Sequence, residues 1–328
     1  MNMQIRHAIF GLASLAIGAG AAQAEQEIIF GISAATGSTQ QQTAAEFARI
    51  MHEKLPGKVN VKVFDNSQLG KDEDMLQKVR LGTMHITLPS STMPEIAAEY
   101  AIFDLPFMVA DRAHLGRIDE TLFKDVLVPK AEEKGYIPLA VWENGFRHIT
   151  NNARPINTPA DLNGLKIRTP NSSWRVAMFR EYGSNPTPMG FSELFVALQT
   201  GVVDGQENPL SNIAGGKLNE VQKYLSMTNH VYTPAFPTMG KAVFERLDPE
   251  IQQALREAAQ EAALWARDRG EQDDIELRDS LVAGGMEMNV ADRAAFVEAS
   301  KPLYEKFASE VENGQEMIDQ VLSLAEGS

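Results

Sequence analysis

The stretch GLKIRTPNSSWRVAMFREYGS (Gly164–Ser184) contains one complete strand–helix unit. Leu165 and Ile167 fall on one side of a short alternating strand and Arg168 falls on the other, which is the twofold period of a strand. The Asn and Ser residues that follow can cap a helix, and Gly183 is a typical helix stop. The unit therefore places an arginine at the end of an apolar strand, just before a proline.

The same alternation of strand and helix runs through the rest of the chain. A helix starting at Asp248-Pro249-Glu250 is longer than the usual ~11–12 residues and is expected to brace two lobes. The pattern predicts an α/β fold of mixed sheets flanked by helices. Strands are predicted at 27–33, 58–64, 84–89, 135–145 and 165–168, and helices at 39–55, 72–81, 171–183, 249–281, 291–310 and 312–325.

Two segments repeat the order helix, glycine, strand: MLQKVRLGTMHITLP (75–89) and LFVALQTGVVDGQENP (194–209). Two lobes of similar plan would produce this repeat, although chance similarity between two such units is the alternative. Crossing strands near 145 and 235 are expected to act as hinges. The predicted division is a signal peptide at 1–24, lobe I at 25–145 plus 234–273, and lobe II at 146–233 plus 274–328.

The first 24 residues have the pattern of a cleaved secretory signal. Arg6 precedes an apolar, small-residue run from Ala8 to Ala22, and an Ala-x-Ala sequence ends at Ala24. A membrane anchor is the alternative, but the run is shorter than the ~20 residues that cross a bilayer. We therefore expect export to the periplasm without membrane insertion.

Composition excludes several classes of function. The 328 residues include no cysteine, which excludes thiol catalysis, thiolate metal sites and a lipid-anchored lipoprotein. Without Arg6, 29 basic residues face 44 acidic ones, a formal charge of −15. Such a surface repels nucleic acid and anionic membranes, so local geometry would have to bind an anion against the overall field.

No catalytic motif is present in the predicted mature chain. The sequence lacks a GxSxG elbow, a phosphate loop and a dinucleotide fingerprint, and its histidines have no paired metal-ligand spacing. Counting carboxylates leaves a glycosidase pair open, although most acids lie beside Lys or Arg as on solvated helix faces. No cofactor and no metal are predicted. The histidines outside the signal are His52, His85, His114, His148 and His230.

Four polar residues follow strands or begin helices: Arg147, Arg168, Asn171 and Asn208. In open α/β sheets, ligands bind beyond the carboxyl ends of the strands, and all four residues have that position. The alternative for Arg168 is an outward-facing side chain whose stem covers the sheet while its head reaches water.

At these residues the chain resembles the substrate-binding proteins of TRAP (tripartite ATP-independent periplasmic) transporters, of the C4-dicarboxylate-binding type. The central block from 164 to 232 is the most specific part, and the resemblance covers essentially the whole predicted mature chain. The stretches that carry it are GLKIRTPNS, SNPTPMGFSELFVALQTGVVDGQENPL, EVQKYLSMTNHVY, SQLGKDEDML and FDLPFMV.

The resemblance implies the two-lobe periplasmic-binding-protein fold, closing around an organic anion. It implies that Arg168 binds the carboxylate, with Asn208 as its carboxamide partner. Phe191 falls at an aromatic wall, Asn171 at a helix start, and Arg147 at a further arginine position. An arginine fork matches both oxygens of a carboxylate, which a lysine does not. For Phe191, a place in the core is the alternative.

The first-lobe contacts are less well defined by the resemblance. Where sialic-acid-binding members carry acidic and basic contacts, this chain has PSSTM (Pro89–Met93), whose hydroxyls suit a polyhydroxy acid. The alternative role for Asp72 is to cap its helix. The alternative for Glu143 is a solvent-facing side chain with no contact to the ligand. The candidate contacts are Ser33, Asp72, Ser90, Ser91, Trp142 and Glu143.

The expected function is a periplasmic receptor that binds a small organic acid and delivers it to TRAP membrane permease subunits. A sugar acid such as a uronate or aldonate is the first candidate ligand, and a C4-dicarboxylate or another hydroxy or keto acid is the second. A periplasmic enzyme acting on acidic sugars and a ligand-sensing partner of a signalling receptor are the other classes considered.

Overall fold

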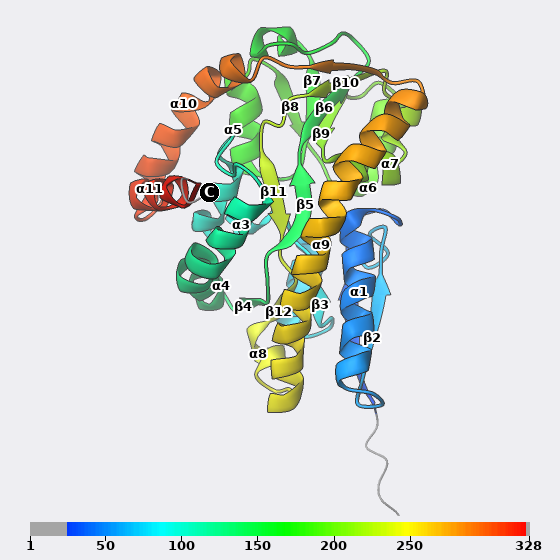
Figure 1. The fold of residues 1–328 in the computed structure, drawn as a ribbon, viewed down its shortest axis with the longest axis vertical. Coiled ribbons are helices and arrows are strands. Elements are labelled where there is room, and N and C mark those ends of the chain that lie inside the picture. Colours follow the sequence, from blue (N-terminus) through cyan, green and yellow to red (C-terminus); the bar gives the residue numbers. More distant parts are fainter. Residues whose placement is uncertain (1–24, 326–328) are drawn as a thin grey trace, which may run out of the picture.

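The computed structural model describes residues 25–325, so the predicted signal peptide at 1–24 lies outside the described residues. Two mixed sheets form the body of the molecule (Figure 1). The first contains, in spatial order, β2 (Val59–Phe64), β1 (Gln26–Gly31), β3 (Ile86–Thr87), β12 (Thr238–Gly240) and β4 (Tyr136–Pro138). The second contains β13 (Glu287–Val290), β10 (Tyr224–Met227), β6 (His148–Asn151), β9 (Gly205–Asn208), β7 (Lys166–Thr169) and β8 (Asn185–Pro188).

A separate antiparallel pair lies between the two sheets, formed by β5 (Trp142–Phe146) and β11 (Tyr232–Ala235). Its register is irregular between Thr233 and Pro234, because proline has no N–H to donate. The predicted α/β class with mixed sheets is confirmed, since β1 runs parallel to β2 and β3 while β12 runs antiparallel to its neighbours.

Helices cover both sheets and are joined by short 3₁₀ and π segments. The α-helices are α1 (Thr39–Lys54), α2 (Asp72–Leu81), α3 (Arg112–Ile118), α4 (Val128–Glu133), α5 (Ser173–Glu181), α6 (Phe191–Gln199), α7 (Leu210–Gly215), α8 (Lys241–Phe244), α9 (Pro249–Ala283), α10 (Arg293–Glu310) and α11 (Gly314–Ala325). The other segments are η1 (Met93–Glu95), η2 (Ala98–Asp104), η3 (Asp119–Leu127), η4 (Pro159–Leu162) and η5 (Leu218–Glu220). None of the helices within 25–325 is both long and apolar enough to cross a membrane.

The 35-residue helix α9 is the predicted brace. Figure 1 shows it running diagonally along the molecule, beside α1 at one end and α7 at the other, and both contacts are close. A stripe of buried alanines, including Ala258, Ala259 and Ala262, lets α9 approach the first sheet's core. Because alanine has the highest helix propensity, the same stripe also favours the long helix itself.

The structure differs from the predicted elements in two places. The single strand predicted at 135–145 is two strands, because β4 joins the first sheet while β5 pairs with β11. The sequence pattern gives no prediction for 93–133, which forms η1 to α4 and contributes many buried apolar residues. The repeated helix–glycine–strand order is present as α2–Gly82–β3 and α6–Gly201–β9.

The strands of each sheet follow the predicted lobes, but the exact lobe boundaries remain a prediction. The helix α10 packs on α5 of the second lobe, whereas α11 packs on α3, which belongs to the first. The C-terminal helices thus contact both halves of the molecule.

Candidate functional site

A narrow cavity of about 50 Å³ lies where strand ends of the two sheets face each other. Residues after β1 and β3 line it from the first lobe, and residues of β7 and β9 line it from the second. It is lined by Ser33, Ala34, Gln40, Asp72, Leu88, Ser90, Ser91, Thr92, Asn144, Arg147, Arg168, Pro170, Phe191, Asn208 and Asn212. We call it the cleft cavity.

Arg168 is the residue that defines the charge of this cavity. Its side chain is directed inward, because the residue is only 3% exposed. Nε and Nη2 both donate to the carbonyl oxygen of Met189, at 3.1 and 2.7 Å. No carboxylate within 25–325 forms an ion pair with it, and Nη1 has no hydrogen-bond partner there. Burial lowers the pKa of Arg168 to about 10, so the guanidinium remains charged at neutral pH.

Behind the cavity, a buried network holds Arg147 in place. Its Nε and Nη2 donate to the carboxylate of Glu207, and Nη2 also donates to Asn208 Oδ1 at 3.0 Å. Glu207 further accepts from Arg175 Nη1 and lies 3.3 Å from His230 Nε2. Arg147 is therefore neutralised by Glu207, whereas Arg168 has no such carboxylate partner in the described part of the chain.

Two buried carboxylate or carboxamide oxygens at the cavity have no donor within the described residues, and the Thr92 hydroxyl there has no partner among them either. One is Asp72 Oδ1 and the other is Asn212 Oδ1. Asn212 is fixed by a relay in which its Nδ2 donates to Asn144 Oδ1, and Asn144 Nδ2 donates to Ser90 Oγ, each at 3.0 Å. Unpaired buried acceptors cost free energy, so both oxygens call for a donor from a bound molecule.

The pKa of Asp72 is also shifted from its ordinary value. Burial raises its pKa to about 6, although a hydrogen bond from Ser33 and the charge of Arg168 oppose this. Because this folded-state pKa lies above the ordinary value of about 3.9, the folded protein binds the proton more tightly than the unfolded chain does. The contribution of Asp72 to stability therefore falls as the pH rises from about 4 to about 6.

Replacing Asp72 with asparagine is expected to raise the free energy of unfolding of the unliganded protein by about 1–3 kcal/mol at pH 7, the upper value being the equivalent of the pKa difference. The gain should vanish near pH 4, where both folded and unfolded chains hold the proton. Urea denaturation at the two pH values measures this. An equal gain at both would contradict the burial of an ionised carboxylate.

The two lobes touch on either side of the cleft cavity. Asn171, which lines a small adjoining cavity, is one of the residues involved. These contacts bring the facing strand ends together and account for the narrowness of the cavity. They are the Lys71–Glu193 ion pair at 2.9 Å, the hydrogen bond from Asn171 Nδ2 to Glu73 at 2.9 Å, and the bonds from Ser173 N and Oγ to Glu95 at 3.0 and 2.9 Å.

The comparison with known families decides the identity of the chain. Residues 30–310 match the model of the DctP family, described as bacterial extracellular solute-binding protein, family 7. This chain belongs to that family. It is therefore a periplasmic TRAP solute receptor and not an enzyme.

Individual relatives of this solute-binding protein agree along almost the full length. The 2,3-diketo-L-gulonate-binding periplasmic protein YiaO of Escherichia coli is 35% identical over 97% of both chains. The sugar acid binding protein DctPAm of Advenella mimigardefordensis, solved with galactonate, is 32% identical with a TM-score of 0.88, covering 92% of this chain and 98% of that one. A Sulfurospirillum deleyianum TRAP solute-binding protein with bound succinate is 32% identical with a TM-score of 0.86, covering 92% and 100%.

Most of the predicted site residues of this solute-binding protein meet at the cleft. Ser33, Asp72, Ser90, Ser91, Arg147, Arg168, Phe191 and Asn208 line the cleft cavity, and Asn171 lines the adjoining one. Phe191 is also partly buried against the second lobe's core, and its contact with a ligand stays a prediction. Asp72 is the first residue of α2 and not its cap, which is Lys71.

Two predicted contacts lie elsewhere, and we remove them from the site. Trp142 is fully buried in the first lobe, where Nε1 donates to Ala259 O and the ring packs on Phe30 and Phe47. Glu143 is also fully buried, bonded by Tyr232 and by Arg112 Nη2 at 2.8 Å. Trp142 and Glu143 were predicted as contacts because they are close in sequence to other site residues. Successive residues of a strand face opposite sides, so closeness in sequence does not place a side chain in the cleft.

Four polar lining residues of the solute-binding protein were not predicted: Gln40, Thr92, Asn144 and Asn212. Gln40 and Asn212 lie on helix faces that are otherwise buried. Gln40 and Asn212 could have been predicted from the sequence, because each is a polar residue on the inward face of a helix. No comparable signal marks Thr92 or Asn144.

Proposed function

We propose that this receptor binds a polyhydroxy monocarboxylate, such as an aldonate or a uronate, with its carboxylate on Arg168. The observation that carries this proposal is the buried guanidinium of Arg168, which has no carboxylate partner within the described chain. A buried charge is stable only when it is paired, so a ligand carboxylate would complete the site.

The unpaired acceptors favour a sugar acid over a dicarboxylate. Asp72 Oδ1 and Asn212 Oδ1 need donors, which the hydroxyls of a sugar acid would supply. A second ligand carboxylate brings no donor at neutral pH and would repel Asp72 once that group is ionised. The ligand of DctPAm, galactonate, has the required chemistry, as does the 2,3-diketo-L-gulonate named for YiaO.

A C4-dicarboxylate is the second candidate, supported by the succinate bound to the Sulfurospirillum protein of the same fold. Asp72 would favour binding of a dicarboxylate only when it is protonated, because the neutral carboxyl group can donate a hydrogen bond to the second carboxylate of the ligand. Its raised pKa makes that form accessible below about pH 6.

Binding would act by closure of the two lobes, with delivery of the acid to TRAP membrane permease subunits. The antiparallel β5–β11 pair joins the lobes and supports our proposal of hinges near residues 145 and 235. Contacts such as Lys71–Glu193 would break on opening, and the ligand would shift the population toward the closed form.

Calorimetric titration at pH 7.5 tests the ligand class. Galactonate is expected to bind at least about tenfold more tightly than succinate, because each acceptor left unpaired costs about 1–3 kcal/mol. Galactitol, which has the hydroxyls but no carboxylate, should not bind at comparable concentrations. Succinate binding that equals or exceeds that of every sugar acid in a panel of aldonates and uronates would favour the second candidate.

A further inference from the structure

A second and larger cavity, of about 490 Å³, shares no lining residue with the cleft cavity. We call it the rear cavity. It is lined by residues from the start of α3, the C-terminal third of α9 and the start of α10. Its lining includes Phe107, Arg112, Phe146, His148, Ile275 and Arg293. Its volume is within the range of small-molecule sites.

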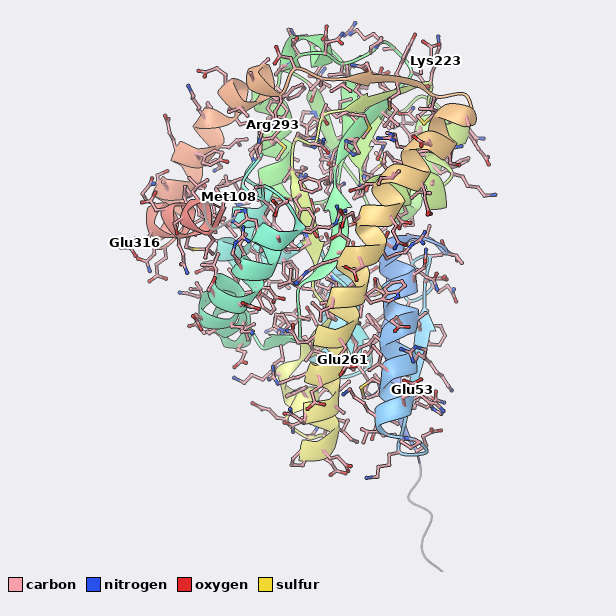
Figure 2. All side chains as sticks on the ribbon, in the orientation of Figure 1. Glu53, Met108, Lys223, Glu261, Arg293 and Glu316 are labelled. Carbon is pink, nitrogen blue, oxygen red and sulfur yellow. The ribbon has the colours of Figure 1, made fainter. Side chains whose placement is uncertain are left out.

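One cation that lines the rear cavity, Arg293, is exposed and has no acidic partner among residues 25–325. Of the three arginines that line it, Arg112 pairs with Glu143 and Asp274 at 2.8 Å, and Arg278 pairs with Asp279. Arg293, labelled in Figure 2, is the first residue of α10 and has no ion pair within 25–325. Its guanidinium carbon lies 4.8 Å from the centre of the Phe107 ring, which orients the group.

The walls around this cation are apolar and partly open to solvent. Ile275 is 57% exposed and Val290 is 76% exposed, and both line the cavity with the Phe107 and Phe146 rings. Phe107 has a φ of 60°, a conformation that is costly for a bulky residue and is concentrated at functional positions. An apolar group bound here would remove this surface from water.

His148 adds a hydrogen-bond donor. The residue is 1% exposed, and its Nδ1 accepts from the backbone N of Asn229 at 3.5 Å. Burial lowers the pKa of His148 to about 3, so the ring is neutral and carries its proton on Nε2. Nε2 has no hydrogen-bond partner within the described residues, although His148 lines the cavity. A single acceptor with negative charge would match both this neutral donor and the exposed cation of Arg293, since both line one cavity.

We propose that the rear cavity is a second binding site, which takes a small monocarboxylate with an apolar or aromatic tail. The carboxylate pairs with Arg293 and accepts from His148 Nε2, and the tail packs between Phe107, Phe146 and Ile275. The cavity is not part of the solute cleft, so this proposal does not depend on the ligand proposed there.

Calorimetric titration of phenylacetate into the purified protein tests the second site. We expect a dissociation constant on the order of 1 mM, as for other ligands of this small size. Arg293→Ala should weaken binding at least about tenfold, through loss of the charge-assisted contact. Ile275→Glu should also weaken it, because the new carboxylate repels the ligand at an exposed position that folding does not require.

Two controls separate this site from the rest of the molecule. Arg256→Ala removes another arginine that stacks on a phenylalanine, 4.7 Å from the Phe244 ring, and should leave phenylacetate binding unchanged. Arg168→Ala should also leave it unchanged. Absence of binding to the unmodified protein, full affinity in Arg293→Ala, or loss of binding in Arg168→Ala would each overturn the proposal, the last because phenylacetate would then occupy the cleft.

Discussion

Replacing Arg168 with alanine is expected to weaken binding of the cleft acid by about 30-fold to several thousand-fold, the range for removing one partner of a buried charged pair. The guanidinium is 3% exposed and has no carboxylate partner within the described chain. Its loss would leave the ligand carboxylate buried without a counter-charge. Titration with the best sugar acid from the panel measures the change.

Two matched variants test whether binding needs the planar pair of guanidinium donors of Arg168 or only its positive charge. Arg168→Lys keeps the charge but loses the planar pair of donors, so binding should still fall at least about tenfold. Lys166→Ala removes an exposed cation two residues earlier on β7 and should leave affinity unchanged. If Arg168→Ala binds the acid as tightly as the unmodified protein does, Arg168 is not the anchor.

Replacing Glu207 with glutamine is expected to lower the free energy of unfolding by about 3–5 kcal/mol at pH 7, as breaking a buried ion pair does. Glu207 is fully buried and accepts from both Arg147 and Arg175. The neutral amide would leave two buried guanidinium groups with Asp104 as the remaining carboxylate of the network, bonded to Arg175 at 2.6 Å. Urea denaturation measures the loss.

The loss should depend on pH in a defined direction. Burial alone would raise the pKa of Glu207, but the charges of Arg147 and Arg175 outweigh it and hold the pKa well below its ordinary value. The stability that ionised Glu207 provides is thus present above about pH 4 and declines as the pH falls further. The difference between the two proteins should therefore shrink below about pH 4.

Glu181→Gln provides the matched control for this variant. Glu181 is exposed at the end of α5, so its replacement should change stability by less than about 0.5 kcal/mol. A small effect of Glu207→Gln, similar to that of the control, would mean that the buried network does not stabilise the fold.

Much of the fold follows from local pattern. The alternation of β7, the cap and stop signals around α5 and the start signal of α9 are visible in the sequence and are present in the structure. The segment 93–133 was not predictable in the same way, because its 3₁₀ and π turns follow no single helical period. Its buried residues are fixed by packing against distant elements such as α11.

The α/β class and the long brace helix follow from the sequence pattern, and the receptor family follows from the resemblance, which also predicts Arg168 as the carboxylate anchor. These features depend on short-range periodicity, caps and contiguous motifs. Only the folded structure shows that Glu207 neutralises Arg147, that Arg168 has no ion pair within residues 25–325, and that Trp142 and Glu143 lie away from the cleft. The physical reason is that charge pairing and burial depend on which distant segments meet, and the spacing along a chain does not specify that.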